Sequence, residues 1–90
     1  MGRRPVVILT RSAAVANRNQ VVVAQITSTI HRLPCEVALT RADGMPRDCV
    51  INCDVPLTVP KARLTSRVAM LSPAKMNEVH QALKFAMEIP

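Results

Sequence analysis

Hydrophobic positions in the first two thirds of the chain recur with the two-residue period of β-strands. The apolar, β-branched run 5–10 predicts a short buried strand, and 21–30 predicts a longer one. Alternation along 21–30 puts Val22, Ala24, Ile26, Ser28 and Ile30 on one face and Val21, Val23, Gln25, Thr27 and Thr29 on the other. Because the first set is apolar apart from Ser28, we expect it to face the core. Thr27 and Thr29 would then lie together on the opposite face.

Shorter strands and turns fill the rest of this region. We expect strands at 35–40, 49–55, 57–59 and 67–71. Pro56 and Pro60 favour strand ends or edges, since proline cannot donate to a sheet ladder. The polar segment 11–20 is expected to be a loop and 31–34 a turn. A further loop is expected at Asp43-Gly44, where glycine permits a positive φ.

The period changes near the end of the chain. Ser72 followed by Pro73 is a preferred helix start, with serine as N-cap and proline in the first helical position. Apolar residues then recur at helical spacing: Met76, Val79, Leu83, Ala86 and Met87. The pattern predicts a single domain over 1–90, mainly β with a C-terminal α-helix (α+β), in which a small sheet or barrel is closed by the helix.

The charge of the chain is strongly basic and unevenly placed. Twelve Lys and Arg residues against six Asp and Glu residues give a net charge of +6, and the first carboxylate is Glu36. Such a surface suggests a polyanionic partner, nucleic acid or acidic protein, although a charge that serves solubility alone is an alternative. Phe85 is the one aromatic residue, which argues against base-stacking platforms.

Several kinds of chemistry are disfavoured by composition. Three cysteines, Cys35, Cys49 and Cys53, are an odd number without the paired spacing of a zinc site, so we expect buried apolar thiols and no metal or cofactor. Two glycines cannot form a phosphate loop, and the six acids are scattered. No 18-residue apolar run and no signal-peptide pattern is present, so we expect no membrane contact and a cytosolic location.

Arg4 and Thr27 are the candidate chemical groups. Arg4 precedes Pro5 at the mouth of a buried strand, and a guanidinium suits two phosphate oxygens at once. Cleavage of RNA by its own 2′-hydroxyl builds negative charge on phosphorus, which a positioned arginine stabilises, while a threonine hydroxyl can hold a phosphate oxygen. His31 directly follows the threonine-rich strand end at 27–30, so we expect it to reach a substrate bound there. His80 falls in the predicted helix and is expected to be structural.

The same segments resemble the MazF/PemK toxins of bacterial toxin–antitoxin systems, in order and over essentially the whole chain. The residues that carry the resemblance are 3–11 (RRPVVILTR), 26–30 (ITSTI), 43–52 (DGMPRDCVIN), 58–64 (TVPKARL) and 71–73 (LSP). The resemblance implies an SH3-like small barrel, usually a homodimer. Against the family pattern, the usual N-terminal strand with its R-G-(E/D)-(I/V)-W motif and glycine-rich loop does not precede Arg3.

The resemblance also implies an activity. It implies a sequence-specific, metal-independent endoribonuclease that leaves a 2′,3′-cyclic phosphate and a 5′-hydroxyl and is neutralised by an acidic antitoxin. The family's catalytic arginine and threonine fall on Arg4 and Thr27, and RNA contacts are expected from Arg3, Arg11, Ser28, Thr29, His31, Arg32 and Arg47. Two alternatives are a CcdB-like toxin that inhibits DNA gyrase by binding, and a relative that binds antitoxin or RNA without cutting.

Overall fold

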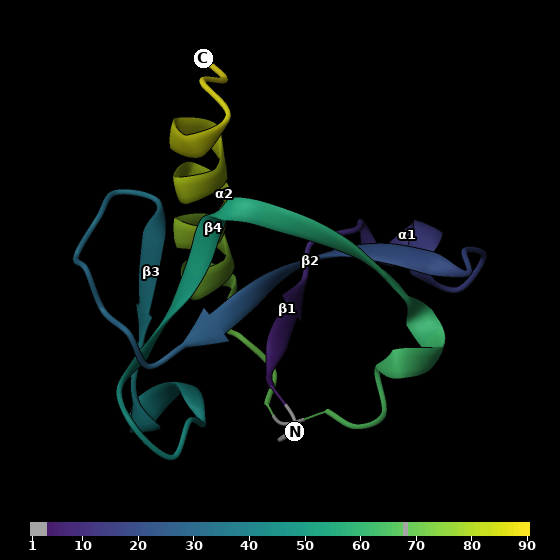
Figure 1. Cartoon of the computed structure of the whole chain (residues 1–90), viewed down its shortest axis with the longest axis horizontal. Helices are drawn as coiled ribbons and strands as arrows, with labels where there is room; N and C mark the ends of the chain where they lie inside the picture. Colours follow the sequence, from purple (N-terminus) through teal and green to yellow (C-terminus); the bar gives the residue numbers. More distant parts are fainter. Residues whose placement is uncertain (1–3, 68) are drawn as a thin grey trace.

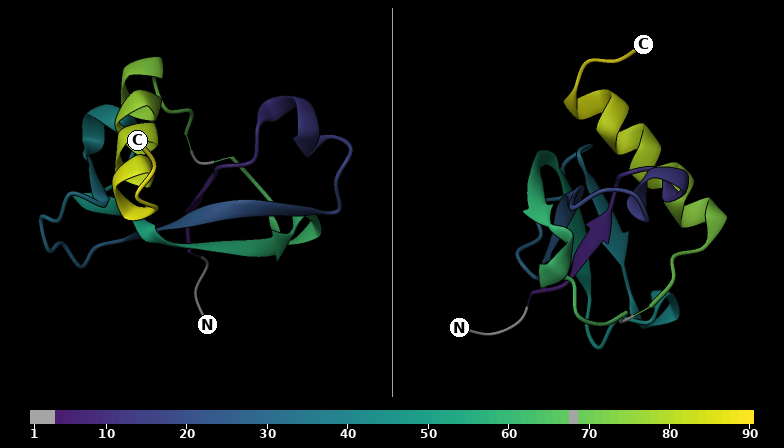
Figure 2. Two further views of the ribbon diagram at one scale, coloured as in Figure 1. Left: turned by 90° about the horizontal axis from the view of Figure 1, so that it is seen from above. Right: turned by 90° about the vertical axis from the view of Figure 1, so that its right-hand side faces the viewer.

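The fold is a curled antiparallel sheet with one helix packed against part of it. The computed structural model describes residues 4–67 and 69–90, and these contain β1 (Val6–Ile8), β2 (Gln20–Thr27), β3 (Glu36–Leu39) and β4 (Cys49–Pro60). The strands are ordered β1-β2-β4-β3. Helix α2 (Pro73–Ala86) contacts β4 and β3, whereas β1 lies at the other edge of the sheet (Figures 1 and 2). This barrel-like α+β arrangement confirms the predicted fold class.

Helix α2 begins where the sequence predicted. The Ser72 side chain accepts a hydrogen bond from the Lys75 amide at 3.1 Å, and Pro73 occupies the first turn. Val79 and Ala82 are buried on the inner face of the helix. The Lys75 ammonium donates to the Ala38 carbonyl at 2.9 Å, which ties the start of the helix to β3. The apolar stripe and this bond together fix α2 against the β3–β4 half of the sheet.

Rows of paired residues build the core beneath the helix. Val7 pairs with Ala24 across β1 and β2, and Ile51 of β4 lies between Ile26 and Val37. Cross-strand partners point to the same face, so each row buries its side chains together. Val7, Ala24, Ile51 and Val37 belong to the core cluster, and Ile26 packs against it. Because successive residues alternate faces, the neighbouring rows point away from the core.

The predicted core face of 21–30 is wrong in its first half. Val21 and Val23 are buried, whereas Val22 is 37% exposed. The cause is an irregularity in the pairing with β4: Val23 pairs with Leu57, but Gln25, two residues later, already pairs with Asn52. The extra residues on β4 change the sheet's local geometry, so Val23 and Ala24 are both buried although they are consecutive. Gln25 and Thr27 do lie opposite the core face, as predicted.

Other differences concern element boundaries. The strands predicted at 49–55 and 57–59 form one strand, β4, that continues through Pro56 at the irregularity. The predicted loop 11–20 contains a short helix, α1 (Ser12–Val15). The strand predicted at 67–71 is wrong for 67 and 69–71, which have no strand partner and leave Met70 74% exposed; residue 68 lies outside the described residues.

The predicted loop at Asp43-Gly44 is confirmed, and Gly44 has the positive φ that glycine permits. A 3-10 turn, η1 (Arg41–Asp43), is capped by Thr40, and Gly44 follows with a φ of +91°.

A second 3-10 turn, η2 (Lys61–Arg63), follows β4. Within residues 4–67 and 69–90, no helix has the length and hydrophobicity needed to cross a bilayer.

Candidate functional site

The register of β1 and β2 brings the two candidate chemical residues together. Val6 pairs with Gln25, and the Ile26 amide donates to the Pro5 carbonyl at 3.1 Å, so the antiparallel register continues beyond the end of β1. One further step sets Arg4 opposite Thr27. Directly opposed residues in an antiparallel pair point to the same face. Arg4 and Thr27 therefore share the face that lies away from the helix-covered core.

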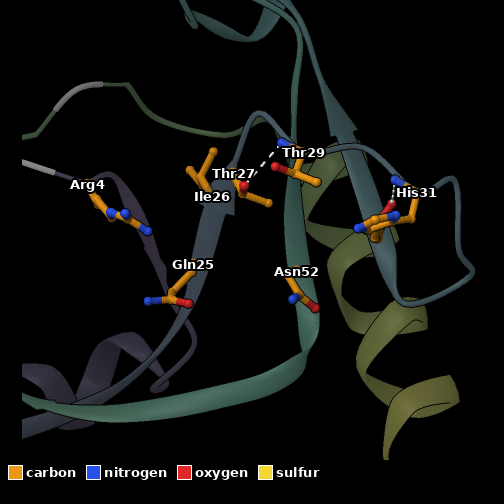
Figure 3. Close-up of a pocket in the computed structure, with 8 residues that line it drawn as sticks. Arg4, Gln25, Ile26, Thr27, Thr29, His31 and Asn52 are labelled. Atoms are coloured by element: carbon orange, nitrogen blue, oxygen red, sulfur yellow. Dashed lines mark hydrogen bonds between the residues drawn. The ribbon is translucent and has the colours of Figure 1, made fainter.

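A pocket of about 250 Å³ opens on this face. Its lining comes from the start of the chain, three strands and the segment after β2: Arg4, Gln25, Ile26, Thr27, Thr29, His31, Glu36 and Asn52. Figure 3 shows Arg4 approaching from the β1 side, Gln25 and Thr27 on β2, and Asn52 on the next strand. Of the sequence-predicted residues, the structure thus gathers Arg4, Thr27, Thr29 and His31 into one cavity.

The hydroxyl of Thr27 is positioned by the chain that follows it. Its Oγ1 accepts a hydrogen bond from the Thr29 amide at 3.1 Å (Figure 3). An oxygen that accepts from an amide keeps its own hydrogen as a donor. The Thr27 hydroxyl can therefore donate a hydrogen bond to an oxygen bound in the pocket, such as that of a phosphate.

Gln25, Asn52 and Glu36 form a row across the pocket that sequence reasoning missed. Asn52 pairs with Gln25 on one side and with Glu36 on the other. The Glu36 Oε1 accepts from the His31 amide at 3.0 Å and from the Leu33 amide at 3.4 Å. The Asn52 Oδ1 accepts from the Asp54 amide at 2.9 Å. The polar character of Asn52 within an apolar strand was the available signal, but its partners depend on a register that the sequence does not show.

Four further predicted RNA contacts within the described residues do not line this pocket: Arg11, Ser28, Arg32 and Arg47. Ser28, Arg32 and Arg47 are exposed on the segments that flank the strands. Arg11 lies just before α1, beyond the opposite end of β1 from Arg4. Arg3 lies outside the described residues. These residues remain predictions as RNA contacts, and a substrate would have to extend well beyond the pocket to reach Arg11.

Of the described residues that line the pocket, one is an arginine and one a carboxylate, Arg4 and Glu36, and these two do not form an ion pair. In residues 4–67 and 69–90, both ion pairs belong to Lys75, which lies 3.4 Å from Glu78 and 3.9 Å from Asp43. No arginine of this part of the chain is engaged by a carboxylate, Arg4 included. An arginine without an internal counter-ion can direct its full guanidinium fork at a phosphate.

The cysteines lie in the core rather than in the pocket. All three are free and buried. Burial is the main reason that the pKa of the Cys53 thiol is raised to about 11, and the adjacent Cys35 adds to the shift. Burial likewise raises the pKa of Cys49, with Asp48 and Asp43 as smaller contributors. Thiols held protonated in this way are poor nucleophiles. Among the described residues, no group of three His, Cys, Asp or Glu side chains is placed to hold a metal ion.

Sequence comparison places related proteins along nearly the whole chain. Residues 1–87 match the family model of the PemK-like, MazF-like toxin of type II toxin–antitoxin systems. "Probable endoribonuclease MazF2" of Mycobacterium tuberculosis is 38% identical over 84 residues, which cover 92% of this chain and 82% of the relative. "Probable endoribonuclease MazF5" of the same organism is 37% identical over 89 residues, covering 98% of this chain and 82% of the relative.

Solved structures agree with the sequence comparison. The Mycobacterium tuberculosis toxin MazF-mt6 superposes with a TM-score of 0.92 at 30% identity, covering 97% of this chain and 88% of that one. An endoribonuclease in complex with its cognate antitoxin, from a mycobacterial species, has a TM-score of 0.88 at 29% identity and covers 99% and 84%. The family model, the sequence relatives and the solved structures each match nearly the whole chain. This chain therefore belongs to the PemK-like, MazF-like toxins of type II toxin–antitoxin systems.

Proposed function

We propose that this toxin is a sequence-specific endoribonuclease that cuts single-stranded RNA, mRNA in particular, at the pocket shared by Arg4 and Thr27. The observation that carries the proposal is the register that sets these two residues opposite each other on one face. The relatives named as endoribonucleases support the reaction class. The mechanism is a transesterification within the RNA that needs no metal ion.

In that reaction the RNA supplies its own nucleophile. The 2′-oxygen attacks the adjacent phosphorus and the bond from phosphorus to the 5′-oxygen breaks, which leaves a 2′,3′-cyclic phosphate and a 5′-hydroxyl. One proton leaves the 2′-hydroxyl and one is added to the 5′-oxygen, so no water is consumed. The His31 imidazole, which lines the pocket, is the side chain suited to carry such a proton.

Arg4 and Thr27 stabilise the charge that develops on the phosphoryl oxygens. The guanidinium of Arg4 can donate two parallel hydrogen bonds to phosphate oxygens, and its positive charge opposes the negative charge that builds there. The Thr27 hydroxyl, held by the Thr29 amide, donates a third. Arginine stays protonated in neutral solution and is a poor proton carrier, so its role is electrostatic.

The partner that restrains this activity is an acidic antitoxin. One structural neighbour was solved with its cognate antitoxin. For this chain, a net charge of +6 and an Arg4 that no carboxylate of the described residues pairs favour an acidic segment that competes with RNA for the same face. We also propose a homodimer, in which exposed apolar side chains such as Phe85, at 59%, and Val55, at 57%, would gain burial. We further propose a cytoplasmic location, because an mRNA substrate is found there.

The test separates cleavage from the two alternatives. Purified toxin should cut a mixed-sequence RNA in the presence of EDTA, and should leave gyrase supercoiling unaffected. Intact RNA together with blocked supercoiling would establish the gyrase-binding alternative instead. RNA that is bound yet remains whole would identify a toxin-family member that binds without cutting.

A further inference from the structure

We propose that Gln25, Asn52 and Glu36 recognise the edge of one nucleobase beside the cut phosphate and favour cytosine and adenine over uracil and guanine. This inference rests on the ribonuclease function proposed above. It follows from the order and polarity of hydrogen-bonding groups along one row of the sheet.

The three side chains point into the same pocket by register. Asn52 on β4 lies between Gln25 on β2 and Glu36 on β3. Thr27 lies on the same face two residues beyond Gln25, about 7 Å along the strand. A nucleotide whose phosphate contacts Arg4 and Thr27 therefore has the row within reach of its base or of its neighbour's base.

Internal hydrogen bonds fix what each group offers to a ligand. A backbone N–H can only donate, so the Asn52 oxygen must face the Asp54 amide, 2.9 Å away, and its NH₂ is left as a donor. The Glu36 Oε1 is taken by the His31 and Leu33 amides, which leaves Oε2 as an acceptor. The Gln25 side chain makes no hydrogen bond within the described residues and can present either end of its amide.

Along the row, Glu36 offers an acceptor, Asn52 a donor and Gln25 either group. The donor of Asn52, in the centre, decides which bases can bind. Cytosine offers its amino group to Glu36, its N3 acceptor to Asn52 and its O2 to Gln25. Adenine offers its amino group to Glu36 and its N1 to Asn52. Uracil and guanine carry an N–H at the central ring position, which would meet the Asn52 donor and leave both donors unsatisfied.

Binding of uncleavable oligonucleotides tests this inference separately from catalysis. Short 2′-deoxy oligomers that differ at one base lack the attacking hydroxyl, and their affinities can be measured by fluorescence anisotropy. We expect the wild type to bind the cytosine oligomer about tenfold more tightly than the uracil oligomer. Asn52→Asp keeps the acceptor for the Asp54 amide but makes the central group an acceptor. Cytosine then opposes the new carboxylate through N3 and uracil still opposes Glu36 through O4, so the preference for cytosine should be lost.

Two control variants make the same change of charge away from the pocket and so separate base reading from the effect of net charge. Glu36→Gln should lower the cytosine-to-uracil ratio, whereas Glu88→Gln, which removes the same charge at an exposed site, should preserve it. Asn77→Asp on the exposed side of α2 controls in the same way for Asn52→Asp. The ratio rather than the absolute affinity is compared, because an added carboxylate weakens all oligomers alike.

The outcomes distinguish this inference from the proposed function. A wild type that cuts RNA but binds the cytosine and uracil oligomers within twofold of each other contradicts base reading alone. Equal ratios in Asn52→Asp and Asn77→Asp, or no measurable binding to any oligomer, also overturn it. A wild type that prefers cytosine but leaves RNA intact supports base reading and contradicts the proposed ribonuclease.

Discussion

Arg4 stands opposite Thr27 because the backbone, rather than a side-chain contact, sets their relationship. The Pro5 carbonyl accepts from the Ile26 amide at 3.1 Å, and this bond joins the residues immediately adjacent to the pair. The backbone at both residues is therefore placed before any substrate arrives. This limits the rearrangement that the proposed catalytic role of the two side chains would require.

Replacing Arg4 tests the electrostatic role. We expect Arg4→Ala to lower the initial rate of cleavage of a fluorogenic RNA by about 10²- to 10³-fold, the usual cost of removing a donor to a developing oxyanion. Arg4→Lys retains the charge but loses the bidentate fork, so its rate should fall between those of the wild type and Arg4→Ala. Arg63→Ala, on η2 beyond the far end of β4, is the charge-matched control. An equal loss in Arg63→Ala would show that net charge matters and position does not.

Thr27 offers a near-isosteric comparison. Thr27→Val removes the hydroxyl and should lower the cleavage rate by about 10- to 100-fold, as expected for a lost hydrogen bond to a charged group. Thr27→Ser keeps the hydroxyl that the Thr29 amide holds and should stay within about threefold of the wild type. Thermal unfolding of all three proteins shows whether they remain folded. If the valine and serine variants cut RNA equally well, the hydroxyl has no role.

Gly44 is predicted to be required for stability and not for chemistry. Its φ of +91° disfavours any side chain, and a Cβ built there would lie 2.8 Å from the Ala69 Cβ. Gly44→Ala should destabilise the protein by about 1–3 kcal/mol, which for a domain of this size lowers the melting temperature by roughly 4–8 °C per kcal/mol. Gly44→Ala combined with Ala69→Gly should recover the steric part but not the backbone strain. No recovery at all would contradict the close approach of these two residues.

The buried Cys53 predicts a loss of stability in alkaline solution. Its folded pKa is raised to about 11 from a usual value of 9.0, so the folded state holds the proton more tightly than the unfolded state. This stabilisation is complete below pH 9 and is lost as the pH rises toward 11, by at most about 1.4 kcal/mol per pH unit. Urea unfolding between about pH 8 and pH 10.5 should show a shallower decline in Cys53→Ala than in the wild type. Val79→Ala, a core variant that keeps the thiol, should retain the wild-type slope.

The sequence predicted the parts of the fold that depend on local chemistry. The Ser72-Pro73 start, the helical stripe from Met76 to Leu83 and the glycine turn at Gly44 are set by nearby residues and were found. Met87, also predicted in the stripe, follows the end of the helix and is 44% exposed. The face of β2 could be assigned correctly only beyond Val23. There the pairing with β4 shifts, and a change of register between distant segments leaves no periodic signal in either strand.

In the candidate site, too, the sequence predicted what depends on local residues and missed what depends on pairing between distant strands. Arg4 and Thr27 were recognisable because each belongs to a short motif with an evident chemical use. Gln25, Glu36 and Asn52 were missed because their significance arises only when three strands align them in one row. Arg11 was expected as an RNA contact from the family resemblance, and the structure places it beyond the opposite end of β1 from Arg4, outside the lining of the pocket.

The chemistry of the RNA ends tests the central claim most directly. A defined single-stranded RNA should be incubated with the toxin in EDTA, and its products analysed by mass spectrometry. The account predicts a 2′,3′-cyclic phosphate on one product and a 5′-hydroxyl on the other, and no cleavage when the nucleotide before the cut carries a 2′-deoxyribose. Products that end in a 3′-hydroxyl and a 5′-phosphate, or cleavage that persists at the 2′-deoxy position, would contradict attack by the 2′-oxygen at the Arg4–Thr27 pocket.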